Sequence, residues 1–118
     1  MHHITIPDLT KAPPRPGRFM LGGRYAWLAR LADKVRAQHA GTNGDYVGYC
    51  SLSTAYLDAV GITEQTFDGL IDQGAEDDDL VAFFDEHVSD ERRRKANRLV
   101  LEDHAESLDR QDAEEGYV

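Results

Sequence analysis

All four prolines of this 118-residue chain fall within its first 16 residues. A proline fixes its own φ angle and disfavours helix at the residue before it, so most of residues 1–21 cannot be helical. Apolar residues within this stretch indicate that it packs on the rest of the chain. We therefore expect an extended, proline-rich N-terminal arm at residues 1–21, followed by a proline-free segment in which helices can form.

The most regular periodicity of the chain lies between Arg24 and Ala40. Apolar residues recur there at steps of three and four, which is typical of an amphipathic helix. Two glycines precede this stretch and Gly41 follows it, as expected for an entry turn and a C-terminal stop. The sequence therefore predicts a first helix over residues 24–40.

Four shorter stretches carry the same helical periodicity, and most of them follow a residue that can cap a helix. No stretch alternates apolar and polar residues as a strand would. The last ten residues are acidic and have little to bury, so we expect them to be disordered. The sequence predicts one all-α domain of about five helices at residues 22–108 and a disordered tail at 109–118; the four later helices are expected at 51–60, 63–73, 77–87 and 89–106.

The composition is that of a soluble domain, with 41% hydrophobic residues and a mean hydropathy of −0.56. No apolar run approaches the roughly 18 residues that a membrane span requires. The N-terminus lacks the basic and apolar regions of a secretory signal, so we expect a cytoplasmic protein without a membrane partner. The chain has one cysteine, Cys50, which excludes an internal disulfide and is compatible with a reducing compartment.

The charge is distributed unevenly along the chain. Residues 1–50 hold seven basic and three acidic residues, a net charge of +4, whereas the whole chain carries −9. An acidic protein is repelled by phosphate backbones, so we expect no nucleic-acid partner. The basic front can pair with the acidic remainder, which is the simpler interpretation, or it can bind a small anion.

Residues 41–50 form a glycine-rich loop that places Tyr46 and Tyr49 beside Asp45 and Cys50. Its spacing matches neither the phosphate loop nor the dinucleotide fingerprint. If the loop folds against the first helix, its tyrosines meet a cationic and aromatic rim suited to a small anionic ligand. In the simpler alternative, the aromatic side chains fill the gap between helix and arm while the cations are solvated.

Catalytic interpretations of individual residues are weaker. Cys50 is a nucleophile only beside a base, and the candidate histidines lie on different predicted helices, so an inert buried cysteine is the simpler interpretation. His2 and His3 have no defined third ligand, and we expect no metal site and no cofactor. Asn97 lies near the inward face of the last predicted helix and would need hydrogen-bond partners there. The candidate binding residues are Arg15, Arg24, Trp27, Lys34, Asp45, Tyr46, Tyr49, Cys50 and Asn97.

Several of these stretches resemble a family of small bacterial proteins, the domain of unknown function 5069. The resemblance covers roughly residues 8–100, although Ala96 stands where the family usually has tryptophan. It implies a compact helical domain and no established activity. The stretches that carry it are Asp8–Pro16, Leu21–Lys34, Gly41-Thr42 with Tyr46 and Cys50, Leu57–Ile62 and Asn97-Arg98.

The sequence favours a non-catalytic binding or interaction module, with its site around Arg24, Trp27, Tyr46 and Tyr49. Its partner would be a small anionic ligand or another protein. One alternative is a small enzyme that uses Asp45, Cys50 or a loop tyrosine as acid, base or nucleophile. Another is a structural subunit of a homodimer, held together by exposed apolar residues.

Overall fold

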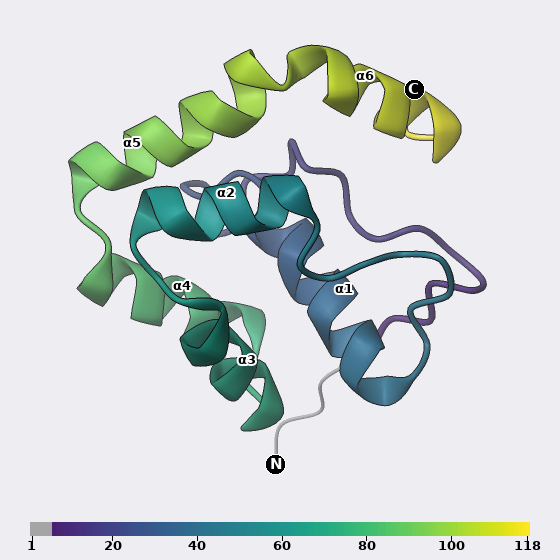
Figure 1. The fold of residues 1–118 in the computed structure, drawn as a ribbon, viewed down its shortest axis with the longest axis horizontal. Coiled ribbons are helices and arrows are strands. Elements are labelled where there is room, and N and C mark those ends of the chain that lie inside the picture. The colour runs from purple at the N-terminus through teal and green to yellow at the C-terminus, as the bar shows by residue number, and fades with distance from the viewer. Residues whose placement is uncertain (1–5) are drawn as a thin grey trace.

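The structure, a computed structural model, describes residues 6–118 and is built of helices (Figure 1). These residues contain no named strand, only an isolated bridge between Leu21 and Tyr25, so the predicted all-α class is confirmed. His2 and His3 lie outside the described residues. The elements are α1 (Leu28–Ala40), α2 (Ser51–Val60), α3 (Glu64–Asp72), α4 (Asp77–His87), α5 (Asp90–Arg98), the π-helical turn η1 (Leu99–Asp103) and α6 (Ala105–Glu114).

Helix α1 lies in the middle of the molecule (Figure 1). Every residue from Leu28 to Ala37 is buried, including four charged ones. Its apolar side chains join a core to which α2, α3, α4, α5 and α6 also contribute. A helix enclosed on all sides is normally apolar all round. The charged residues of α1 therefore need partners from other segments.

The start of α1 differs from the prediction. The helix begins at Leu28 rather than Arg24, because residues 22–26 form turns whose hydrogen bonds run to Met20 and Leu21. Trp27 is the one non-glycine residue with positive φ, 69°, in the part of the chain that the structure describes. Its backbone N–H donates to Gly17 O at 2.8 Å, and its indole is 1% exposed. This burial holds a backbone conformation that costs roughly 1–2 kcal/mol outside glycine.

Gly17 is required by this packing. A Cβ atom built on it would lie 2.7 Å from the Trp27 ring, closer than side chains tolerate. Residues 6–27 contain no helix. Several of them are buried, among them Leu9 and Leu21, and Leu9 N donates to Thr42 O at 2.8 Å. This segment therefore lies against the domain over the residues that the structure describes.

The C-terminal part corrects two predictions. The single helix expected at 89–106 is divided into α5, η1 and the start of α6. The prediction of a disordered tail at 109–118 is wrong, because α6 extends to Glu114. Leu108 is fully buried, and Arg18 pairs with Asp109 at 2.7 Å and Asp112 at 2.8 Å. The acids of this segment thus meet arginines from the basic front of the chain, and the helix remains ordered.

None of the helices formed by residues 6–118 is both long and apolar enough to cross a membrane.

A series of linked ion pairs connects α1 to Arg15 and to α4. The Asp33 carboxylate accepts hydrogen bonds from Arg15 Nε and Nη2, both at 3.0 Å. Arg15 Nη1 and Arg36 Nη1 each donate to Asp77 at 2.9 Å. Burial by itself would raise the pKa of Asp77, but the hydrogen bonds from Arg15 and Arg36 outweigh it and hold this pKa below its ordinary value of 3.8.

We expect Asp77→Asn to lower the free energy of unfolding by about 1–2 kcal/mol at neutral pH, a modest figure because Asp77 is partly solvated. A depressed folded-state pKa stabilises the fold above the ordinary carboxyl pKa, and this contribution disappears as the pH falls. The difference between wild type and D77N should therefore be full at neutral pH and shrink below about pH 4. Urea unfolding at several pH values measures it.

Asp78→Asn is the matched control. Asp78 lies in the same first turn of α4 and is exposed, so D78N removes an equal charge from the helix N-terminus without removing an ion pair. Equal destabilisation by D77N and D78N would show that the helix dipole, and not the ion pairs, accounts for the effect.

Candidate functional site

The charged residues of α1 that face the 41–50 loop form a buried cluster. Arg30 and Lys34 are one helical turn apart, so they project from the same face. Their side chains are 3% and 4% exposed. Around them lie side chains from the entry to α1, the loop, α2 and the C-terminus. We call this set the Arg30–Lys34 cluster; it comprises Trp27, Arg30, Lys34, Tyr46, Cys50, Ser53 and Glu115.

One half of the cluster is a carboxylate-binding arrangement. Arg30 Nη1 and Nη2 donate to the two carboxylate oxygens of Glu115, each at 2.7 Å. The Tyr46 hydroxyl donates to Glu115 Oε2 at 3.1 Å. Burial and the neighbouring Glu115 raise the pKa of Tyr46, so the phenol remains a donor at neutral pH. Two parallel hydrogen bonds from one guanidinium are the strongest form of arginine–carboxylate recognition.

The aromatic rings complete this half. The Arg30 guanidinium lies 5.6 Å from the centre of the Trp27 ring and 5.8 Å from that of Tyr46. Arg30 Nε is buried and has no hydrogen-bond partner among residues 6–118. The arginine is therefore held between two aromatic faces, with its terminal nitrogens directed at the carboxylate of Glu115.

The other half of the cluster surrounds a sulfur atom. Lys34 Nζ lies 3.3 Å from Cys50 Sγ, and Ser53 Oγ lies 3.4 Å from the same sulfur. Trp27 Nε1 donates to Ser53 Oγ at 3.0 Å, and Lys34 Nζ lies 5.2 Å from the centre of the Trp27 ring. The cysteine expected to be inert thus has a buried lysine and a buried serine as neighbours.

Burial and charge act in opposite directions on these two groups. Burial lowers the pKa of Lys34, and the nearby sulfur only partly offsets this effect. Burial by itself raises the pKa of the Cys50 thiol. The charge of Lys34 and the hydrogen bonds with Ser53 outweigh this effect, and the pKa lies below its ordinary value. While Cys50 is a neutral thiol, the cluster holds the positive charges of Arg30 and Lys34 against the single carboxylate of Glu115.

The family model for the domain of unknown function DUF5069 matches residues 11–117. The chain belongs to the DUF5069 family. The match spans nearly the whole chain and includes Glu115, so both halves of the cluster lie within the DUF5069 domain. No curated protein matches the sequence.

The structure of this DUF5069 domain brings four of the candidate residues together, namely Trp27, Lys34, Tyr46 and Cys50. These residues do not form the surface rim expected from the sequence, because Trp27 and Lys34 are buried. Arg30 lies at the centre of the cluster.

The other candidates lie elsewhere in the DUF5069 domain. Arg15 belongs to the ion-pair chain with Asp33 and Asp77. Arg24 is half-exposed and faces Asp85 at 3.3 Å and Asp90 at 3.7 Å, on the side of α4 and α5. Asp45 is exposed in the loop. The predicted convergence of Arg24 with Tyr46 and Tyr49 does not occur, because residues 22–26 turn away from the loop instead of continuing α1.

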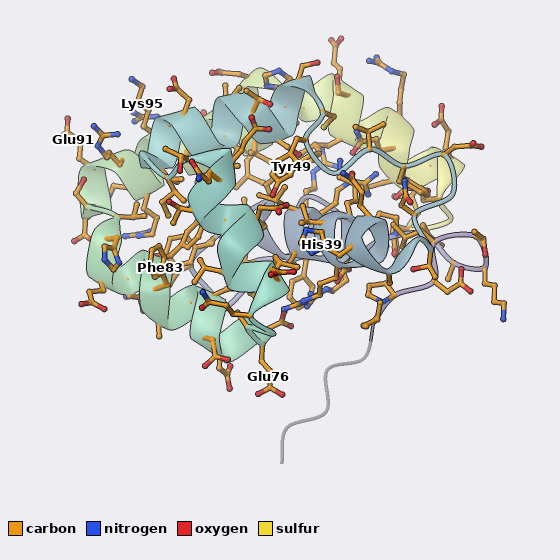
Figure 2. All side chains as sticks on the ribbon, turned by 60° about the horizontal axis from the view of Figure 1, so that its bottom comes forward. His39, Tyr49, Glu76, Phe83, Glu91 and Lys95 are labelled. Atoms are coloured by element: carbon orange, nitrogen blue, oxygen red, sulfur yellow. The ribbon has the colours of Figure 1, made fainter. Side chains whose placement is uncertain are left out.

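Tyr49 joins a separate group near the surface. Its hydroxyl donates to Asp68 Oδ1 at 2.9 Å, and His39 Nε2 lies 2.9 Å from the same oxygen. Figure 2 shows His39 and Tyr49 close together at the face formed by α1 and α3. These contacts connect the loop and α1 to α3, and they leave Tyr49 outside the Arg30–Lys34 cluster.

Two cluster residues, Glu115 and Ser53, were not identified from the sequence. Glu115 is one of several acids in a segment expected to be disordered, and no local pattern distinguishes it. Ser53 lies in the helix predicted at residues 51–60. Its position three residues after Cys50, in the first turn of a predicted helix, was a usable signal, because residues at that spacing lie side by side.

Asn97 has a structural role in the DUF5069 domain. Its Oδ1 accepts a hydrogen bond from Ala26 N at 3.1 Å, and its Nδ2 donates to Arg24 O at 2.8 Å. The amide therefore connects α5 to the turn that leads into α1. The hydrogen-bond partners expected for Asn97 are thus backbone groups, and the residue lies outside the Arg30–Lys34 cluster.

We expect Asn97→Ala to lower the free energy of unfolding by about 1–2 kcal/mol, because the mutation leaves two backbone groups without their partner. Chemical denaturation measures the change. Arg98→Ala is the control: Arg98 is exposed on the same helix, and its loss should change stability by no more than about 0.5 kcal/mol. An Asn97→Ala variant as stable as wild type would show that the clamp contributes nothing.

Proposed function

We propose that this protein is a non-catalytic binding module of the bacterial cytoplasm, and that its ligand is a small carboxylate bound between α1 and the 41–50 loop. The observation that carries the proposal is the Arg30–Glu115 pair. Arginine and tyrosine donors converge there on one carboxylate. The chain's own Glu115 occupies this position, and a ligand carboxylate that replaces Glu115 would meet the same donors.

The way in which Glu115 is attached supports exchange. It is the residue at the end of α6, followed by Gly116 with φ 81°. Beyond it, Tyr117 donates through its N–H to Asp112 O at 2.8 Å and through its hydroxyl to Pro14 O at 2.6 Å. Residues 116–118 are thus held to the rest of residues 6–118 by two hydrogen bonds, both from Tyr117, and a segment held by few contacts opens more readily than the core does.

Electrostatics also favours an anion. The cluster holds Arg30 and Lys34 against Glu115, and the burial of these side chains reduces screening by water. While Cys50 is a neutral thiol, a ligand with a second negative group would neutralise the charge of Lys34 in addition to that of Arg30. A small dicarboxylate therefore suits the cluster better than a monocarboxylate does.

Localisation in the cytoplasm is part of the same proposal. The one cysteine of the chain is a free thiol, and reducing compartments preserve free thiols. Cys50 approaches Lys34 of α1 as a free thiol. A reducing environment therefore keeps this half of the cluster intact.

We expect Glu115→Gln to bind succinate at least about tenfold more tightly than wild type does, because a tethered carboxylate competes at an effective concentration in the millimolar range. Trp27 is the only tryptophan of the chain and lies against Arg30, so its fluorescence reports binding. Acetate should bind more weakly than succinate, and chloride at equal ionic strength should give no saturable change.

Two controls separate binding from general charge effects. Glu114→Gln removes an equal charge from an exposed neighbour and should behave as wild type does. The double variant R30Q/E115Q replaces both partners by neutral amides and should lose succinate binding. No saturable signal in folded E115Q with either carboxylate would overturn the proposal.

Should E115Q fail to fold, Tyr117→Phe provides a second route. It keeps Glu115 and removes only the hydrogen bond to Pro14, so the terminal segment should open more often. We expect tighter succinate binding than in wild type, by a smaller factor than in E115Q. An affinity unchanged from wild type in Y117F would contradict the exchange of Glu115 for a ligand.

A further inference from the structure

We infer that Cys50 is a reactive thiolate that hydrogen peroxide oxidises to a sulfenic acid, with Lys34 as its counter-ion and proton donor. This inference concerns covalent chemistry at the sulfur and does not depend on carboxylate binding by Arg30. It rests on three features of the structure: the burial of Lys34, the orientation of Ser53 and the position of Cys50 at the N-terminal end of α2.

The burial of Lys34 is the first feature. Its side chain is 4% exposed, and Cys50 Sγ is its one hydrogen-bond partner within residues 6–118. An ammonium group has three donors, and burying it without an anionic partner costs several kcal/mol. Glu115 is already bound by Arg30 and Tyr46. The thiolate form of Cys50 is therefore the nearest anion that neutralises Lys34.

Ser53 adds a second, oriented donor. Trp27 Nε1 donates to Ser53 Oγ at 3.0 Å, so the serine oxygen acts as acceptor there and its own hydrogen is free to point elsewhere. Cys50 Sγ lies 3.4 Å from Ser53 Oγ. Ser53 is fully buried, and water therefore does not compete for this contact. The sulfur thus receives one donor from α1 and one from α2.

The position of Cys50 at the N-terminal end of α2 is the third feature. Cys50 is the N-cap residue of that helix, where free N–H groups and the helix dipole stabilise a negative charge. The thiol pKa lies below its ordinary value although burial raises it, because Lys34 and Ser53 act in the opposite direction. Arg30 and Glu115 are the other charged groups of the cluster, and their charges largely cancel each other.

The reaction balances with the groups present and one peroxide molecule. The thiolate attacks one peroxide oxygen, so an S–O bond forms as the O–O bond breaks, and two electrons pass from sulfur to peroxide. The departing hydroxide takes a proton from the Lys34 ammonium and leaves as water. The products are Cys50 sulfenic acid and a neutral Lys34 amine.

The surroundings select a small oxidant and preserve the product. Cys50 is half-buried, so hydrogen peroxide reaches it more readily than a bulky disulfide or alkylating agent does. The chain has no second cysteine, and no internal thiol can convert the sulfenic acid into a disulfide. The sulfenic acid should therefore persist long enough to be trapped.

The test treats the full-length protein with hydrogen peroxide and traps sulfenic acid with dimedone, located by peptide mass mapping because the chain also has two methionines. We expect dimedone on Cys50 in wild type and none in Cys50→Ser. Lys34→Met should react about tenfold more slowly at pH 7, because it loses both counter-ion and proton donor. Lys95→Met, the control, replaces an exposed lysine (Figure 2) and should react as wild type does.

A measurement without variants of Lys34 keeps the inference testable if K34M does not fold. The measurement is a titration of thiolate absorbance from acid to alkaline pH, with C50S as the blank. It should show that Cys50 ionises at lower pH than the thiol of a short unfolded cysteine peptide. Ionisation at the same pH as that peptide, or equal peroxide rates in wild type and folded K34M, would overturn the inference.

Discussion

The structure depends on one constraint: its central helix is buried but carries charges. Helix α1 has Arg30, Asp33, Lys34 and Arg36 within a stretch whose residues are all buried. Charged side chains removed from water are tolerated only when they are paired. Segments distant in sequence therefore have to supply partners at defined positions around α1. The arrangement of residues 6–27, the loop, α4 and the C-terminus follows from this requirement.

The partners are not equivalent. Asp33 and Arg36 meet fully charged groups in Arg15 and Asp77, and Arg30 meets the Glu115 carboxylate through two short hydrogen bonds. Lys34 differs, because its partner is a thiol. A carboxylate is charged at neutral pH without assistance, whereas the thiol becomes a matching anion only by losing a proton. The four charges of α1 thus comprise three complete pairs and one pair that is chemically adjustable.

Trp27 couples the two halves of the cluster. Its ring contacts both Arg30 and Lys34, its indole N–H orients Ser53, and its backbone adopts positive φ just before α1. This conformation is unfavourable for any residue except glycine and persists because the ring is completely packed. The same packing requires Gly17, since any side chain there would meet the ring. The strained backbone of Trp27 thereby helps to position Arg30, Lys34 and Ser53.

The sequence by itself determined the helical class, the positions of most helix ends and the matching of a basic front with an acidic remainder. These properties depend on local periodicity, on capping residues and on net charge, which neighbours along the chain specify. Only the tertiary structure decided that α1 starts at Leu28, that α6 is ordered, and that Glu115 and Ser53 join the cluster. The order of α6 and the position of Glu115 depend on contacts between residues far apart in sequence, such as Arg18 with Asp112 and Arg30 with Glu115. Local propensity does not contain such contacts, because the energy that orders an acidic segment comes from the arginines it meets only after the chain has folded.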